Sequence, residues 1–140
     1  MKILILNGPN LNKLGRRDAN QYGHETLDEI QKFITNRFPQ HTFQFMQTNK
    51  EGELIDAIQA AEGKFDGIAA NFGGYSHTSV AIRDALELIE IPVIEVHLSN
   101  IYSRESFRFQ GITAAMADGV IAGLGKQSYV LGVRALEELK

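Results

Sequence analysis

Short, almost purely apolar runs that end abruptly in polar side chains constrain the fold of this chain more than any other feature. Three such runs cover residues 3–6, 67–70 and 92–96. A strand that is buried on both faces of a parallel sheet has this continuous apolar character. In open α/β sheets, ligands bind beyond the carboxyl ends of such strands, and Asn7, Asn71 and His97 stand at those ends here. The pattern therefore predicts a small-molecule site at one edge of a parallel sheet.

Segments with helical periodicity separate the apolar runs. Thr26 and Glu29 have the spacing of a capping box, and the apolar stripe that follows them stops at Pro39. Further helices are expected from about Leu54 to Gly63, over residues 78–89, and from about Lys126 onward. Strands are expected over residues 3–6, 41–47, 67–70, 92–96 and 119–122, the second of them at a sheet edge.

This alternation of five strands and four helices predicts one α/β domain over residues 1–140. The expected architecture is a flavodoxin-like, doubly wound, five-stranded parallel sheet with the strand order 2-1-3-4-5. That order places the first, third and fourth strands beside one another. Their polar ends would then adjoin and form a common site.

The charge balance and the cysteine count narrow the function classes. A net charge of -3 without a block of like charge argues against nucleic acid as a partner. The absence of cysteine removes disulfides, thiolate nucleophiles and cysteine-based metal sites. His77 and His97 lack the spacing of a helix-borne zinc pair, so no metal is expected. The first apolar run is too short for a membrane span or a signal-peptide core, and we expect a cytoplasmic protein.

The connection between the first strand and the first helix, residues 7–25, is unusually long. Loops between a strand and a helix usually have about 2–6 residues. Long loops in compact domains are often active-site lids, although a plain surface loop is the alternative. We therefore expect a lid over about residues 15–24, at the same sheet edge as the polar strand ends.

Glu95 and His97 are two residues apart in one expected strand, so their side chains point to the same side. The carboxylate could orient the imidazole, which is the usual general acid or base near neutral pH. A structural histidine at a strand end is the alternative for His97, but a carboxylate in a buried strand needs a partner. His77 lies just before an expected helix start, where either ligand binding or a capping role fits.

Arginine residues lie near Tyr22 in the long connection and again in the stretch after the fourth expected strand. A phenol such as that of Tyr22 is a poor base unless cations favour its ionised form, which an arginine of the same loop could do; an exposed loop tyrosine is the simpler interpretation. Arg104 and Arg108 would share a face of a helical turn and could hold a carboxylate, although solvated arginines are commoner. No serine lies in a G-x-S-x-G elbow, so a serine nucleophile is not expected.

Taken together and in this order, these residues resemble type II 3-dehydroquinate dehydratase over nearly the whole chain. Several long blocks at matching separations carry the resemblance, which is more specific than any single motif. The blocks are residues 7–12 with Leu14-Gly15, then Arg17 with Tyr22-Gly23, residues 75–84, residues 93–101, and Gly123-Leu124-Gly125. The resemblance implies a lyase that removes water from 3-dehydroquinate to give 3-dehydroshikimate, in the shikimate or quinate pathway.

The resemblance also implies catalytic roles for five residues of this chain. Tyr22 would be the base that takes a proton from the carbon beside the ketone, and Arg17 would keep that tyrosine ionised. Asn10 would help to hold a water molecule against the developing enolate. His97, oriented by Glu95, would protonate the departing hydroxyl. No lysine stands at a strand end, which agrees with chemistry that uses no Schiff base and no cofactor.

Further roles that the resemblance implies concern substrate binding and assembly. Asn71, His77 and Arg108 would bind the ring hydroxyls, while Ser99 and the backbone of Leu98 would bind the carboxylate. Asp84 is expected to reach the site of a neighbouring subunit, because the family forms dodecamers built from trimers.

The chain departs from the family pattern at a few positions near these residues. Asp18-Ala19 replaces a usual Glu-Pro in the lid, and the lid should therefore be looser, because proline restricts the backbone. Phe72 stands where proline is common, and Tyr102 where histidine is common. Residues 109–111 replace a run that usually contains histidine and serine. None of the implied catalytic positions is lost.

Other functions that would use the same fold have less support. A flavodoxin-like binding domain for FMN or another phosphate ligand needs a phosphate loop after the first strand, where Pro9 offers no N–H group. A phosphoacceptor domain would need an aspartate where Asn71 stands. A degenerate family member that binds the ligand without converting it is a third alternative.

Overall fold

All five strands of the protein pair in parallel, in the order β2-β1-β3-β4-β5, as the sequence predicted. The computed structural model describes every residue from Met1 to Lys140. The strands are β1 (Lys2–Asn7), β2 (Thr42–Gln47), β3 (Gly67–Asn71), β4 (Val93–His97) and β5 (Gly119–Ala122). Asn7 of β1 lies in register with Asn71 of β3, so two of the polar strand ends are neighbours.

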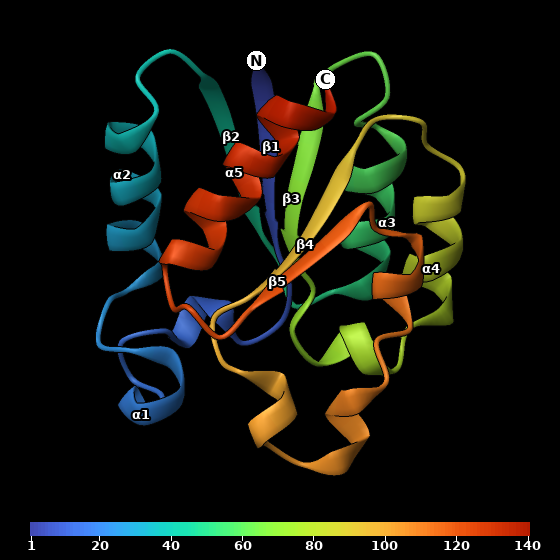
Figure 1. Cartoon of the computed structure of the whole chain (residues 1–140). Helices are drawn as coiled ribbons and strands as arrows, with labels where there is room; N and C mark the ends of the chain where they lie inside the picture. Colours follow the sequence, from blue (N-terminus) through green and yellow to red (C-terminus); the bar gives the residue numbers. More distant parts are fainter.

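Helices cover both faces of this sheet (Figure 1). They are α1 (Ala19–Tyr22), α2 (Leu27–Arg37), α3 (Glu51–Gln59), α4 (Val80–Glu87) and α5 (Gln127–Leu139). Alternate residues of β1 serve two separate cores: Ile3 and Ile5 pack in the core with α2 and α5, whereas Leu4 and Leu6 pack in the core with α3 and α4. Burial on both faces explains why the strands are continuous apolar runs. No helix has the length and apolar character that crossing a membrane requires.

Helix boundaries differ from the expectations by a few residues, and one helix was not expected. The capping box of Thr26 and Glu29 is present and starts α2. The helix α3 starts at Glu51, earlier than expected, and α4 is shorter than residues 78–89, with Ser79 capping its start and Leu88 following its end. The additional helix, α1, lies in the long connection before α2 and begins where the Asp18 side chain accepts a hydrogen bond from the Asn20 N–H.

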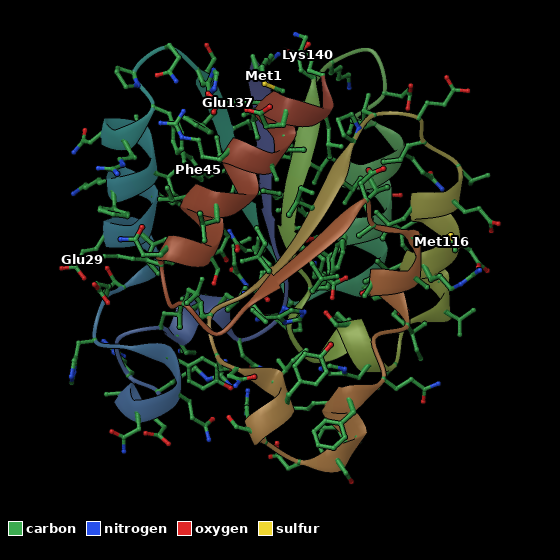
Figure 2. All side chains as sticks on the ribbon, viewed as in Figure 1. Met1, Glu29, Phe45, Met116, Glu137 and Lys140 are labelled. Carbon is green, nitrogen blue, oxygen red and sulfur yellow. The ribbon has the colours of Figure 1, made fainter.

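Short 3₁₀ turns follow the carboxyl ends of β1, β3 and β4, in the lower part of Figure 1. They are η1 (Leu11–Lys13), η2 (Gly73–His77), η3 (Ile101–Ser103) and η4 (Ser106–Phe109). A fifth turn, η5 (Thr113–Met116), precedes β5 and packs against α4. Figure 2 shows Met1 and Glu137 at the opposite end of the molecule. There, His41 bonds the Met1 ammonium at 3.2 Å and the Glu137 carboxylate at 2.7 Å. The two ends of the sheet are therefore built for different purposes, one for packing the termini and one for presenting polar groups.

The loops after β1 and β3 lie directly against each other. The Gly8 N–H donates to the Asn71 carbonyl at 2.7 Å. A Cβ atom on Gly8 would lie 2.6 Å from the carbonyl oxygen of Phe72, so only glycine allows this approach. Phe72 itself is fully buried. The aromatic side chain at this position therefore packs into the core beneath the loop.

Candidate active site

A cavity of about 120 Å³ opens at the carboxyl end of the sheet, between the loops that follow β1, β3 and β4. Polar and charged side chains form most of its lining. It contains every residue that the resemblance placed in the site except Glu95 and Asp84; those present are Asn10, Arg17, Tyr22, Asn71, His77, His97, Leu98, Ser99 and Arg108. The predicted location of the site is thus where the cavity lies.

Tyr22 and Arg17 form a pair within the long connection. The Arg17 Nη2 atom donates to the Tyr22 hydroxyl at 2.9 Å, and the Arg17 Cζ atom lies 3.9 Å from the centre of the Tyr22 ring. The short helix α1 sets their spacing, and Gly23 ends that helix with a positive φ of 78°. An arginine of this loop therefore does reach the phenol, although the sequence spacing alone favoured an exposed loop tyrosine.

Arg104 is a second arginine at the Tyr22 ring, whereas its sequence spacing suggested only that it could hold a carboxylate together with Arg108. Its Cζ atom lies 5.2 Å from the ring centre, and its Nη1 atom donates to the Ser99 hydroxyl at 3.1 Å. Only 11% of its side chain is exposed, and its buried Nε atom has no hydrogen-bond partner. The four-residue spacing between Arg104 and Arg108 was the only sequence signal for Arg104. It could not show that the Arg104 side chain points into the cavity toward Tyr22 and Ser99.

Glu95 and His97 interact as the strand spacing predicted. The His97 Nε2 atom lies 2.8 Å from Oε1 of Glu95, and the carboxylate is fully buried behind the cavity. Its other oxygen, Oε2, accepts a hydrogen bond from the Thr113 hydroxyl at 2.6 Å. Thr113 is also fully buried, and no sequence signal pointed to it. The buried carboxylate therefore has a donor on each oxygen, as burial of a charge requires.

His77 lies against His97, with ring centroids 6.2 Å apart and planes inclined by 20°. It belongs to η2 rather than to the helix that follows, and its Nδ1 atom bonds the backbone carbonyl of Gln110 at 2.9 Å. Arg108 completes this side of the cavity. Its Nε atom donates to Glu105 at 2.7 Å, and this bond holds the pKa of the Glu105 carboxyl below its usual value.

Asn71 is held by a buried network that the sequence did not reveal. Its Nδ2 atom donates to the Tyr129 hydroxyl at 3.4 Å, and its Oδ1 atom accepts from the Gly73 N–H at 3.1 Å. The Tyr129 hydroxyl in turn donates to Oδ1 of Asn7. Complete burial raises the pKa of Tyr129 well above that of an ordinary phenol, so this tyrosine stays neutral.

Asn10 and Asp84 occupy very different surroundings. Asn10 has a positive φ of 70°, and its N–H donates to Oδ1 of Asn49 at 3.0 Å, which holds its side chain at the cavity wall. Asp84 lies on α4, outside the cavity of its own chain, where it pairs with Arg83 at 2.8 Å. Its side chain is 58% exposed. The structure of one chain therefore does not bring Asp84 to the site.

The loop after β1 is poorly suited to a phosphate. The Gly8 and Asn10 N–H groups already donate to Asn71 and Asn49, and Pro9 has none. A phosphate loop needs several free N–H groups directed at the ligand. Nor do three or more histidine, aspartate or glutamate side chains lie close enough together to bind a metal ion. The donors and acceptors of the cavity are side chains suited to a small hydroxylated anion.

Comparisons with known proteins agree with this geometry. The family described as "Dehydroquinase class II" matches residues 1–137. A protein of Pseudomonas putida named 3-dehydroquinate dehydratase 2 is 52% identical over 98% of this chain and 93% of its own. A 3-dehydroquinate dehydratase of Pelodictyon phaeoclathratiforme is 49% identical over 97% of this chain and 91% of its own. The crystal structure of a type II dehydroquinase from Butyrivibrio crossotus superimposes with a TM-score of 0.94 at 42% identity, covering 98% of this chain and 97% of that one. The chain therefore belongs to the class II dehydroquinase family.

Proposed function

We propose that this protein dehydrates 3-dehydroquinate to 3-dehydroshikimate through an enolate intermediate, as a step of the shikimate or quinate pathway. The observation that carries the proposal is the presence of two hydrogen-bonded side-chain pairs at one cavity. Arg17 with Tyr22 can accept a proton, and Glu95 with His97 can supply one. The named relatives, at about half identity over nearly the whole chain, support the same substrate.

Proton abstraction would begin at Tyr22. Its oxygen takes a proton from the carbon beside the ketone, and the C–H electron pair moves into an enolate. Arg17 donates to that oxygen at 2.9 Å and Arg104 lies 5.2 Å from the ring centre, so negative charge on the phenolate lies near two cations. Residues 15–24 would act as a lid, and exclusion of water by the lid would strengthen both interactions.

The enolate would be stabilised by a water molecule that Asn10 helps to hold. The Asn10 side chain makes no hydrogen bond within the protein, whereas its backbone is fixed by Asn49. Fixed donors directed at a developing oxyanion typically contribute several kcal/mol to catalysis. The enolate then collapses, the C–O bond to the leaving hydroxyl breaks, and His97 supplies the proton that makes this group water.

The remaining polar residues of the cavity would bind the substrate. Asn71, His77 and Arg108 would contact the ring hydroxyls, and Ser99 with the Leu98 backbone would bind the carboxylate. The cavity lining contains no lysine, so it offers no amine for a Schiff base. We propose that the reaction uses neither an imine nor a metal ion nor another cofactor.

We infer that the protein forms dodecamers built from trimers and works in the cytoplasm, with Asp84 of each chain reaching a neighbour's site. The exposed position of Asp84 on α4 supports this, since its carboxylate pairs only with the neighbouring Arg83 and otherwise faces solvent, where another subunit could meet it. Light scattering should show a particle much larger than one chain, and an active monomer would contradict the shared site.

Direct measurement of turnover tests the proposed function. Purified protein is mixed with 3-dehydroquinate, and the ultraviolet absorbance of the conjugated enone product is followed. We expect the absorbance to rise, both in the presence of a chelator and after borohydride treatment with substrate. A flat trace with tight binding of the ligand would instead indicate a non-catalytic, flavodoxin-like binding domain.

A further inference from the structure

Two histidines of the site present different ring nitrogens to the protein. His77 uses Nδ1 to bond the Gln110 carbonyl at 2.9 Å, whereas His97 uses Nε2 to bond the Glu95 carboxylate at 2.8 Å. Carbonyl and carboxylate oxygens only accept hydrogen bonds, so each of these nitrogens must carry a hydrogen. The second nitrogen of each ring has no partner in the protein, and both rings line the cavity.

Both contacts depend on one short segment, residues 110–113. The Gln110 carbonyl receives His77 directly. Thr113 acts one step further back, since its hydroxyl donates at 2.6 Å to the Glu95 oxygen that does not face His97. Rotation of the Glu95 carboxylate is thereby blocked, and its Oε1 atom stays directed at the imidazole. The segment therefore acts on both histidines: directly on His77 through the Gln110 carbonyl, and on His97 through Thr113 and Glu95.

The segment is itself fixed to the rest of the fold. The Ile112 N–H donates at 2.8 Å to the carbonyl of Ser76, next to His77 in η2. Thr113 is fully buried in η5, a turn that packs against both α4 and η2. A buried hydroxyl with a short, direct bond to a buried carboxylate is held in one orientation, because neither group can turn to water.

We propose that residues 110–113 fix opposite tautomers of His77 and His97, and that Thr113 is a positioning residue for His97. His77 then presents an unprotonated Nε2 to the substrate and can only accept from a hydroxyl there. His97 presents Nδ1, and this is the nitrogen that gains and delivers the catalytic proton. Thr113 does not line the cavity and touches no substrate, so it acts only through Glu95. The role of His97 Nδ1 in catalysis rests on the proposed function, whereas the assignment of the two tautomers does not.

Nitrogen-15 NMR of the ring nitrogens tests the tautomers without turnover. At a pH at which the nitrogen-15 shifts show both rings to be neutral, we expect His97 to carry its hydrogen on Nε2 and His77 on Nδ1. Gln110→Ala should leave His77 unchanged, because the bond comes from the backbone. The reverse tautomer at either ring of the unaltered protein would overturn the proposal, whatever the variants do.

Two variants of Thr113 distinguish the contribution of its hydroxyl from that of its methyl group. Thr113→Val keeps the size and loses the hydroxyl, so we expect a His97 tautomer mixture and a kcat lower by about tenfold, with KM nearly unchanged. Thr113→Ser keeps the hydroxyl and should retain both the tautomer and most of kcat. Equal losses in both variants, with the tautomer intact, would show a packing role and overturn the proposal.

The same data distinguish failure of this inference from failure of the proposed function. If the unaltered protein does not convert 3-dehydroquinate but Thr113→Val still mixes the His97 tautomers, the proposed function fails and the positioning role stands. Full activity and an unchanged tautomer in Thr113→Val would remove Thr113 from the site while leaving the function intact.

Discussion

The Tyr22 hydroxyl accepts a hydrogen bond from Arg17 at 2.9 Å, while the same guanidinium lies 3.9 Å from the ring centre. One arginine therefore contacts both the oxygen and the face of the residue proposed as the base. The two side chains are five positions apart, and the short helix α1 between them makes this arrangement possible.

Removal of the Tyr22 hydroxyl tests its role as the base. Tyr22→Phe should lower kcat by at least about 100-fold, because general base catalysis commonly contributes that much. Binding of substrate should change little, since the ring remains and Asn71, His77 and Ser99 are untouched. Enone absorbance gives kcat, and calorimetry with the substrate gives the affinity. Retained turnover would exclude Tyr22 as the base.

Neutralising the buried carboxylate tests its coupling to His97. Glu95→Gln keeps the shape but replaces one acceptor oxygen with an amide NH₂ group, which only donates. The side chain can then no longer offer one oxygen to His97 and the other to Thr113. We expect kcat to fall by about tenfold to 100-fold, with a smaller change in KM. His97→Asn should cost at least as much. The double variant should lose little more than His97→Asn alone, and additive losses would show that Glu95 acts independently of His97.

The buried Tyr129 network predicts a loss of stability. Tyr129→Phe leaves Oδ1 of Asn7 without its donor in a site that excludes water. An unsatisfied buried acceptor typically costs about 1–3 kcal/mol, and urea unfolding should show that decrease. Tyr102→Phe, at an exposed tyrosine, is the matched control and should change stability by less than about 0.5 kcal/mol. Equal effects of the two changes would contradict the role assigned to the network.

The ion pair between Glu25 and Lys126 predicts a pH dependence of stability. The Lys126 ammonium bonds Glu25 at 2.6 Å and, more than any other group, holds the pKa of that carboxyl below its ordinary value of 4.5. The folded state therefore favours ionised Glu25. This contribution is complete above about pH 4.5 and is lost as the pH falls toward the lower pKa of the folded state.

Glu25→Gln measures that contribution. Because the pair is partly exposed, we expect the variant to lose at most about 1 kcal/mol of stability at pH 7. The difference from the unaltered protein should shrink as the pH is lowered through 4.5, as urea unfolding at several pH values can show. A difference that grows on acidification would have the wrong sign for a carboxyl with a lowered pKa.

Features set by neighbouring residues were readable from the sequence. Residues 3–6 predicted a strand buried on both faces, and the Thr26–Glu29 spacing predicted the start of α2. Glu95 and His97 share a side because side chains alternate along a strand. The parallel arrangement then brought the strand ends together, so the location of the site followed from local patterns and simple topology.

Contacts between distant segments were decided only by the tertiary structure. Tyr129 meets Asn7 across 122 positions, and Thr113 meets Glu95 across 18. Arg104 reaches Tyr22 only because η3 and the connection that carries Tyr22 border the same cavity. No periodicity connects such pairs, since their proximity depends on how whole elements pack. The sequence alone thus determined the strands, their polar ends and the residues proposed to do the chemistry. The packing of α5, η3 and η5 around the sheet decided which groups hold those residues in place.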